Sequence, residues 1–161
     1  MIFFEDIGMK LMEMLKGEFI LEDLKARNKH DVLAELATVF AKERPRVDAD
    51  AMLQVLLERE RLGSTGIGDG IAIPHGKLPG LDEMLLSFGR SVEGIGFDAM
   101  DGKPVHLFFL LMAPENSAGL HLKVLAMISR MLKDPAFRGS LLGAKGKEDL
   151  LEIIERQEDR S

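Results

Sequence analysis

The sequence predicts one α/β domain in which helices cover a β-sheet. Apolar residues recur at helical spacing up to Arg61 and again after Pro114. Three short apolar runs between these regions are bounded by glycine, proline and aspartate, as strands are. Helices that flank a strand-rich middle are typical of a layered α/β fold. The length of 161 residues suits a single domain over residues 1–161.

Three helices are expected before the first strand. The first, at about residues 5–16, carries an apolar stripe and is expected to be peripheral to the domain. The second runs from Lys29 to Arg44, where a proline follows and stops it. Asp48 is a suitable N-cap for the third helix, which ends in the charged run Glu58–Arg61.

Three apolar runs are predicted to be strands, namely Ile71–Pro74, Leu85–Val92 and Val105–Ala113. The third run is apolar almost throughout. We therefore expect it to be a central strand that is covered on both faces of the sheet.

Helical spacing returns in the last third of the chain. The predicted inner face of the next helix consists of Leu122, Leu125, Ala126, Ile128, Ser129 and Leu132. Two shorter helices, near Pro135–Leu142 and Lys147–Gln157, are expected to close the chain. No internal repeat interrupts this order.

The composition excludes several classes of function. The chain has no cysteine, which excludes disulfides, cysteine nucleophiles and thiolate metal sites and suits a reducing cytoplasm. A formal charge of −6 without a cluster of Lys and Arg argues against a nucleic-acid partner. The N-terminus lacks the features of a signal peptide, and no apolar run is long enough to insert in a membrane. We therefore expect a cytoplasmic protein.

The glycine-rich stretch "GSTGIGDGIAIPHGK" from Gly63 to Lys77 suggests nucleotide binding at first sight. Its spacing argues against that function. A P-loop needs glycine five residues before its Gly-Lys pair and a hydroxyl residue after it, but Ile71 and Leu78 stand there. The dinucleotide fingerprint also fails, because the glycines alternate evenly and follow a helix. The stretch either simply joins a helix to a strand or positions the histidine at its far end.

The surroundings of His75 favour the second possibility. Pro74 fixes its own φ and keeps Ile73 extended, so the proline restrains the histidine that follows. The histidine stands at the expected end of a strand, and strand ends of open α/β sheets line binding crevices.

The other three histidines differ in their expected roles. His30 is expected on the surface of a helix, and His106 at the start of the central strand is expected to be structural. His121 lies just inside a helix N-terminus, which favours an anion. His75 and His121 leave two alternatives open. One is a metal site that needs a further carboxylate ligand, and the other is phosphoryl transfer supported by Arg59 or Arg61.

A resemblance to a known family adds to these observations. The stretch "LLERERLGSTGIGDGIAIPHGKL" (Leu56–Leu78) closely resembles the active-site signature of phosphotransferase-system (PTS) IIA proteins of the fructose/mannitol/nitrogen class. The resemblance continues through "GIGFDAMDGKPVHLFFLLMAP" (Gly94–Pro114) and "HLKVLAMISRML" (His121–Leu132). The wording Gly-Ser-Thr-Gly-Ile-Gly looks most like the nitrogen-regulatory branch.

The resemblance implies a single-domain fold with a mixed β-sheet covered by helices on both faces. It also implies a phosphotransferase with a phosphohistidine intermediate. In this resemblance His75 is the phosphorylated nucleophile, His121 positions the phosphoryl group, and Arg59 stabilises its charge, with Arg61 a weaker candidate. Neither a cofactor nor a metal is implied.

The implied donor is a histidine phosphocarrier protein of the HPr or NPr kind. The implied acceptor is a IIB component in sugar uptake. The alternative is a nitrogen-type regulator that controls partner proteins through the phosphorylation state of His75. No IIB or IIC segment is present in these 161 residues, so the sequence alone does not decide between the two.

Overall fold

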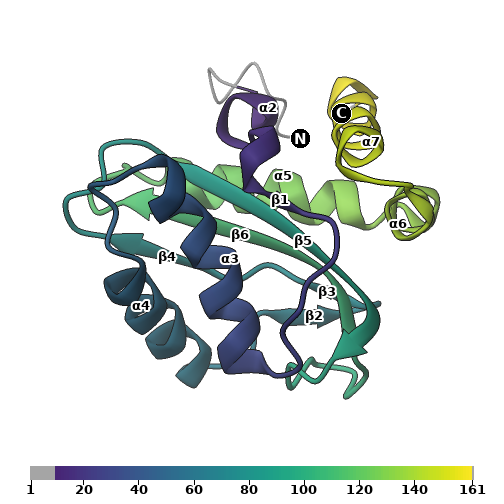
Figure 1. Cartoon of the computed structure of the whole chain (residues 1–161), viewed down its shortest axis with the longest axis horizontal. Helices are drawn as coiled ribbons and strands as arrows, with labels where there is room; N and C mark the ends of the chain where they lie inside the picture. The colour runs from purple at the N-terminus through teal and green to yellow at the C-terminus, as the bar shows by residue number, and fades with distance from the viewer. Residues whose placement is uncertain (1–9, 161) are drawn as a thin grey trace.

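The computed structural model describes residues 10–160, and their central feature is a six-stranded mixed sheet (Figure 1). The strand order is β1-β5-β6-β3-β2, and β4 also pairs with β6. The β5–β6 and β2–β3 pairs are antiparallel, whereas β1–β5, β3–β6 and β4–β6 are parallel. The strands are β1 (Ile20–Leu21), β2 (Gly66–Gly68), β3 (Ile71–Ala72), β4 (His75–Leu78), β5 (Leu85–Ile95) and β6 (Val105–Pro114).

Helices cover both faces of this sheet, as predicted. Figure 1 shows α3 and α4 in front of the sheet and α5 behind it, with α6 and α7 beyond one end. The helices are α2 (Leu11–Met14), a 3₁₀ turn η1 (Gly17–Phe19), α3 (Lys29–Glu43), α4 (Ala49–Arg61), α5 (Leu120–Leu132), α6 (Pro135–Gly143) and α7 (Lys147–Arg160). The α/β fold class is therefore confirmed.

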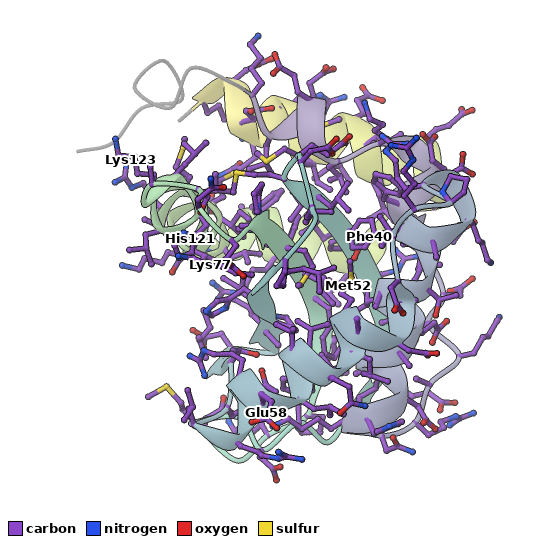
Figure 2. The ribbon with its side chains drawn as sticks, turned by 90° about the vertical axis from the view of Figure 1, so that its left-hand side faces the viewer. Phe40, Met52, Glu58, Lys77, His121 and Lys123 are labelled. Carbon is purple, nitrogen blue, oxygen red and sulfur yellow. The ribbon has the colours of Figure 1, made fainter. Side chains whose placement is uncertain are left out.

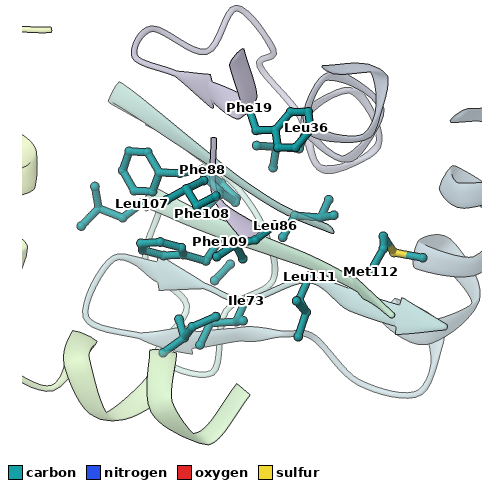
Figure 3. Packing of buried hydrophobic residues seen from close by; sticks show 14 of the residues in the cluster. Phe19, Leu36, Ile73, Leu86, Phe88, Leu107, Phe108, Phe109, Leu111 and Met112 are labelled. Atoms are coloured by element: carbon teal, nitrogen blue, oxygen red, sulfur yellow. The ribbon is translucent and has the colours of Figure 1, made fainter. Parts of the chain in front are cut away.

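Strand β6 forms the centre of the hydrophobic core (Figure 3). Side chains alternate between the two faces of a strand, so its neighbouring phenylalanines pack in opposite directions. Phe109 packs against Phe88 with ring centroids 4.9 Å apart, and Phe108 packs edge-on against Phe97 at 5.4 Å. Residues of β6 are buried on both faces, which confirms the expected central strand.

Strands β3 and β4 lie along β6 in one register. Ile71 is opposite Leu107 and His75 is opposite Leu111, so both strands keep the same offset to β6. Between them Pro74 has no N–H to donate, and the N–H of Ile73 donates to the Thr65 carbonyl instead.

Two details of the predicted strand Ile71–Pro74 are therefore corrected. The strand ends at Ala72, and His75 begins a second strand rather than following the end of one. At the interruption the Ile73 N–H bonds to the glycine loop, while the Pro74 carbonyl still accepts from the Leu111 N–H of β6 at 2.9 Å.

Side-chain caps fix where the helices α3 and α4 begin. The Asn28 side chain accepts from the Asp31 N–H at 2.8 Å, and the Asp48 side chain accepts from the Ala51 N–H at 3.1 Å. Each cap satisfies a backbone donor that the first turn of a helix leaves free. The predicted N-cap Asp48 is thus confirmed, and so is the end of its helix at Arg61.

The predicted inner face of helix α5 is wrong in part. Leu122 is 61% exposed and Ala126 is exposed, whereas the buried residues are Val124, Met127, Ile128, Met131 and Leu132. Apolar residues occur on more than one side of this helix, so spacing alone did not select the face. Packing against β6 and α6 selects it, and the flexible methionines fill the contact.

The two ends of the described chain meet. The predicted first helix, residues 5–16, falls partly on residues 1–9, which lie outside the described residues. Within the described part, α2 buries Leu11 and Met14. The buried carboxylate of Glu158 on α7 accepts hydrogen bonds from the N–H groups of Leu11 and Met12. The two predicted closing helices are confirmed as α6 and α7.

Candidate active site

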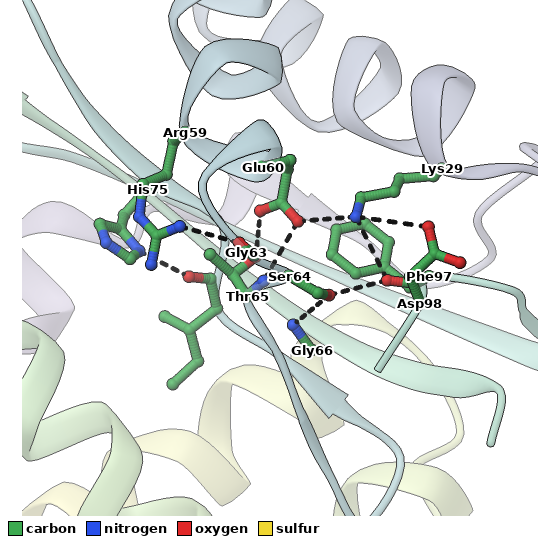
Figure 4. A network of polar contacts seen from close by, with 11 residues as sticks. Lys29, Arg59, Glu60, Gly63, Ser64, Thr65, Gly66, His75, Phe97 and Asp98 are labelled. Carbon is green, nitrogen blue, oxygen red and sulfur yellow. Dashed lines mark hydrogen bonds and ion pairs between the residues drawn. The ribbon is translucent and has the colours of Figure 1, made fainter. Parts of the chain in front are cut away.

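His75 is the first residue of β4, and a hydrogen bond fixes the protonation of its ring. Its Nδ1 atom lies 2.9 Å from the Ile73 carbonyl oxygen (Figure 4). A carbonyl oxygen can only accept, so Nδ1 must carry the proton. The neutral imidazole then has its lone pair on Nε2, which is the nitrogen available for attack.

The surroundings of His75 favour the neutral ring. Partial burial lowers the pKa of the imidazole, because the charged form loses solvation there, and the charge of Arg59 lowers it further. The Ile73 carbonyl and the Glu60 carboxylate act in the opposite direction and raise it. The net result is a pKa below the ordinary value for histidine, so His75 is neutral and nucleophilic at neutral pH.

Arg59 lies in the last turn of α4 and faces the glycine loop. Its Nη1 donates to the Gly63 carbonyl at 2.9 Å. Its positive charge acts on His75, which brings these two predicted site residues together (Figure 4). Arg61, the weaker candidate, instead pairs with Glu58 on the surface.

His121 is the second residue of α5 and is held by the turn before that helix. Its Nδ1 lies 3.1 Å from the Ser117 hydroxyl oxygen. Partial burial lowers the pKa of His121, and its electrostatic interactions with Lys77 and with the protonated form of His75 lower it further. When the Ser117 hydroxyl donates to Nδ1, the proton of the neutral ring sits on Nε2, where it can donate to an anion.

Strand geometry places Lys77 on the same side of β4 as His75. Side chains at positions i and i+2 share a face, while Gly76 between them faces α4. Figure 2 shows Lys77 beside His121 at the end of the molecule that faces the viewer. Both His75 and Lys77 act electrostatically on His121, so the two histidines, far apart in the sequence, lie near each other in the fold.

Gly76 allows helix and strand to approach closely at this point. A Cβ atom on Gly76 would lie 2.6 Å from Cγ1 of Val55 on α4. This distance is far below ordinary van der Waals contact, so only glycine fits without a shift. The close approach keeps the helix that carries Arg59 against the strand that carries His75.

Exposed apolar side chains lie around the glycine loop. Leu62, directly after α4, is 85% exposed, and Met100 is 81% exposed. Met100 is attached to the loop, because its N–H donates to the Gly66 carbonyl at 3.0 Å. Ile67 in β2 and Leu122 beside His121 are also exposed. Exposed apolar side chains are typical of a protein-binding face where they form a contiguous patch.

The remaining histidines lie apart from these interactions. His30 is exposed and contacts Asp31, and His106 on β6 is hydrogen-bonded to the Ser91 carbonyl at 2.9 Å, as expected of a surface and a structural residue. Among residues 10–160 no three histidine or carboxylate side chains come close enough to hold a metal ion. No helix in that range has the length and apolarity to cross a bilayer.

The fold and this site define an α/β protein of the enzyme IIA class. A family model described as "Phosphoenolpyruvate-dependent sugar phosphotransferase system, EIIA 2" matches residues 13–157. The chain therefore belongs to the EIIA type 2 family of the phosphotransferase system, and the resemblance found in the sequence is confirmed.

Within this family the chain is similar to nitrogen regulatory proteins. The protein of that name from Bradyrhizobium diazoefficiens is 40% identical over 146 residues, which are 91% of this chain and 95% of the relative. The crystal structure of nitrogen regulatory protein IIA-Ntr from Neisseria meningitidis superposes with a TM-score of 0.83 at 36% identity, covering 88% of this chain and 97% of the other.

Sugar-specific relatives are similar as well. The fructose-specific EIIABC component of Bacillus subtilis is 35% identical over 150 residues, which are 93% of this chain but 24% of that longer protein. The mannitol IIA protein of Escherichia coli, whose structure is known in complex with phosphorylated mannitol IIB, shares the fold with a TM-score of 0.72. At 22% identity that likeness, which covers 88% of this chain and 98% of that one, shows the fold alone.

Proposed function

We propose that this chain is a phosphohistidine carrier that regulates partner proteins through the phosphorylation state of His75. The observation that carries the phosphohistidine part of this proposal is the hydrogen bond from Nδ1 of His75 to the Ile73 carbonyl, which leaves Nε2 free. A pKa below the ordinary value favours the neutral ring. The identity to nitrogen regulatory proteins over nearly the whole chain supports the regulatory role over sugar transport. A cytoplasmic location is part of the proposal.

The transfer step follows from this geometry. The Nε2 lone pair of His75 attacks the phosphorus of a phosphohistidine on the donor protein, and a new P–N bond forms. The donor's P–N bond breaks, and its electron pair returns to the donor imidazole. Positive charge develops on the ring of His75, and the Ile73 carbonyl stabilises it through the Nδ1–H. When the phosphoryl group passes to an acceptor, a bond forms between phosphorus and the acceptor. The P–N bond at His75 breaks, and its electron pair returns to the ring of His75.

Arg59 and His121 are proposed to stabilise the moving phosphoryl group. The transition state of phosphoryl transfer spreads negative charge over three oxygens, so nearby donors lower its energy. Arg59 offers a guanidinium next to His75, and neutral His121 offers an Nε2–H. The histidine phosphocarrier protein that acts as donor, of the HPr or NPr kind, would dock on the exposed apolar side chains around the loop.

A second function, transfer to a IIB component during sugar uptake, is favoured by one observation. The fructose-specific relative matches 93% of this chain at 35% identity. The two functions share the first phosphorylation step and differ in the acceptor. They are distinguished by measuring transfer to a IIB protein and binding to regulated partners separately.

The first experiment incubates the chain with phosphoenolpyruvate, enzyme I and a histidine phosphocarrier protein. Intact-mass spectrometry should detect one added phosphoryl group per chain. We expect none on the His75→Ala variant, whereas His30→Ala, a change at an exposed histidine, should behave as wild type. Equal labelling of His75→Ala would contradict the assignment of His75.

A second experiment addresses His121 and the acceptor. The His121→Ala variant should still accept the phosphoryl group but pass it on slowly, and normal onward transfer would contradict its positioning role. Partner capture is then compared between His75→Ala and the negatively charged His75→Asp variant. A partner bound by one form and not the other supports regulation, and efficient transfer to a IIB protein supports transport.

A further inference from the structure

Two glutamates flank Arg59 in the last turn of α4, and their surroundings differ. The Glu58 side chain is 66% exposed and pairs with Arg61, whereas the Glu60 side chain is 5% exposed. Burying a carboxylate is costly unless charged or hydrogen-bonding partners surround it. The partners of Glu60 therefore indicate its role.

Glu60 is bound to the glycine loop at Thr65 (Figure 4). Its Oε1 accepts from the Thr65 backbone N–H at 3.1 Å, and its Oε2 accepts from the Thr65 hydroxyl. Thr65 is itself 4% exposed. The paired contact fixes both the backbone and the side chain of this residue, because two donors of Thr65 meet two oxygens of one carboxylate.

Lys29 completes the set of partners and extends it to another part of the chain. Its Nζ lies 2.9 Å from Glu60 Oε1, 3.4 Å from the Phe97 carbonyl oxygen and 4.6 Å from the centre of the Phe97 ring. The Ser64 hydroxyl donates to the same carbonyl at 2.8 Å. The loop is thus attached to the start of α3 and to the segment after β5 at once.

A continuous series of hydrogen bonds runs from Glu60 to the ring of His75. Glu60 binds the Thr65 N–H, and the carbonyl of the same residue accepts from the Ile73 N–H at 3.1 Å. The Ile73 carbonyl in turn accepts from Nδ1 of His75 at 2.9 Å. The contact that sets the tautomer of His75 therefore depends on a backbone that Glu60 holds in place.

We propose that Glu60 is a positioning residue for phosphoryl transfer at His75, an inference that rests on the function proposed above. Glu60 fixes Thr65, Thr65 fixes the backbone of Ile73, and the Ile73 carbonyl keeps the proton of His75 on Nδ1. Nε2 is thereby kept free for attack.

The charge of Glu60 has a second effect. It raises the pKa of His75, whereas the adjacent Arg59 lowers it. The two neighbouring residues therefore oppose each other in setting the charge of the nucleophile. The loss of Glu60 should therefore lower the pKa of His75, because the effect of Arg59 is then no longer opposed.

The variant Glu60→Gln tests the proposal, and Glu58→Gln is its matched control. Both variants remove one carboxylate charge from the same helical turn, but only Glu60 contacts the loop. The glutamine amide has one acceptor oxygen where the carboxylate has two, so it cannot give separate oxygens to the Thr65 N–H and the Thr65 hydroxyl. It also lacks the charge that pairs with Lys29. Two measurements are made: the tautomer and pKa of His75 by imidazole ¹⁵N NMR on the unphosphorylated chain, and the rate of phosphorylation by the phosphorylated carrier protein.

We expect Glu60→Gln to give a mixture of His75 tautomers, a lower His75 pKa and phosphorylation slowed by about tenfold or more, as small misplacements of a reacting group do. Glu58→Gln should match wild type in all three. A Glu60→Gln variant that loses stability but keeps the tautomer, pKa and rate of wild type would show that Glu60 is structural only.

If Glu60→Gln does not fold by circular dichroism, Thr65→Val removes only the hydroxyl contact and should shift the tautomer in the same direction to a smaller extent. An unchanged His75 in Thr65→Val then overturns the proposal. If wild type accepts no phosphoryl group, the proposed function fails, while the NMR comparison still decides whether Glu60 positions His75.

Discussion

The substitution Gly76→Ala should reduce the stability of the fold through a single contact. The new Cβ would lie 2.6 Å from Cγ1 of Val55. Overpacking of this kind costs about 1–3 kcal/mol. The lower entropy of the unfolded chain with alanine returns about 0.4–1 kcal/mol. We therefore expect a net loss of up to about 2.6 kcal/mol, which corresponds to a fall in Tm of up to roughly 10 °C for a domain of this size.

The second substitution Val55→Ala isolates that contact. With Cγ1 absent only the entropic gain remains, so Gly76→Ala should stabilise that background by about 0.4–1 kcal/mol. The double-mutant cycle should therefore show a coupling equal to the overpacking cost of about 1–3 kcal/mol. Urea unfolding is followed by far-ultraviolet circular dichroism, because the chain has neither tryptophan nor tyrosine for fluorescence. An equal cost of Gly76→Ala in both backgrounds would refute the close approach of α4 and β4. In the Val55 background the variant should also be phosphorylated more slowly, since β4 moves away from the helix of Arg59.

Three further predictions concern the charge of His75. The rate of phosphorylation should fall as the pH drops, with a midpoint below the ordinary histidine pKa of about 6.5, because only the neutral ring attacks; a midpoint above that value would contradict the effect of burial. Arg59→Gln should raise the His75 pKa measured by NMR, since a charge that lowers it is removed, and should slow phosphorylation by about 10²-fold. The folded pKa is depressed, so the unfolded chain binds the proton more readily. The unfolding free energy of wild type relative to His75→Gln should therefore be constant above about pH 6.5 and fall below it, and urea titrations across that range measure it.

Much of the fold could be predicted because long elements carry their own periodic signal. The helices α3 and α4 and the strand β6 each have enough residues for the pattern to be read, and Asp48 marks one start directly. The strands β1, β2 and β4 have only two to four residues each, and they exist because a partner strand is present. A sequence pattern does not contain that partner, so these strands were missed.

In the candidate site too, some residues could be predicted from the sequence and others could not. His75 and His121 could be singled out because proline, glycine and element boundaries surround them, whereas Arg59 is preferred to Arg61 through the family resemblance. Glu60 could not, because it stands inside the charged run Glu58–Arg61, where nothing in the sequence sets it apart from Glu58. Successive residues of a helix point about 100° apart. Glu58 therefore faces solvent, while Glu60, two residues further along the helix, is turned towards the loop.

The burial of Glu60 thus depends on where α3 and the loop lie, which only the assembled fold determines. The sequence holds one hint, since Thr65 and Lys29 supply the donors that a buried carboxylate requires. Their separation of 36 residues along the chain gives no reason to join them before the structure does. The nucleophile of the proposed reaction could therefore be found from its neighbours in sequence, whereas the residue proposed to orient it could be found only from its neighbours in space.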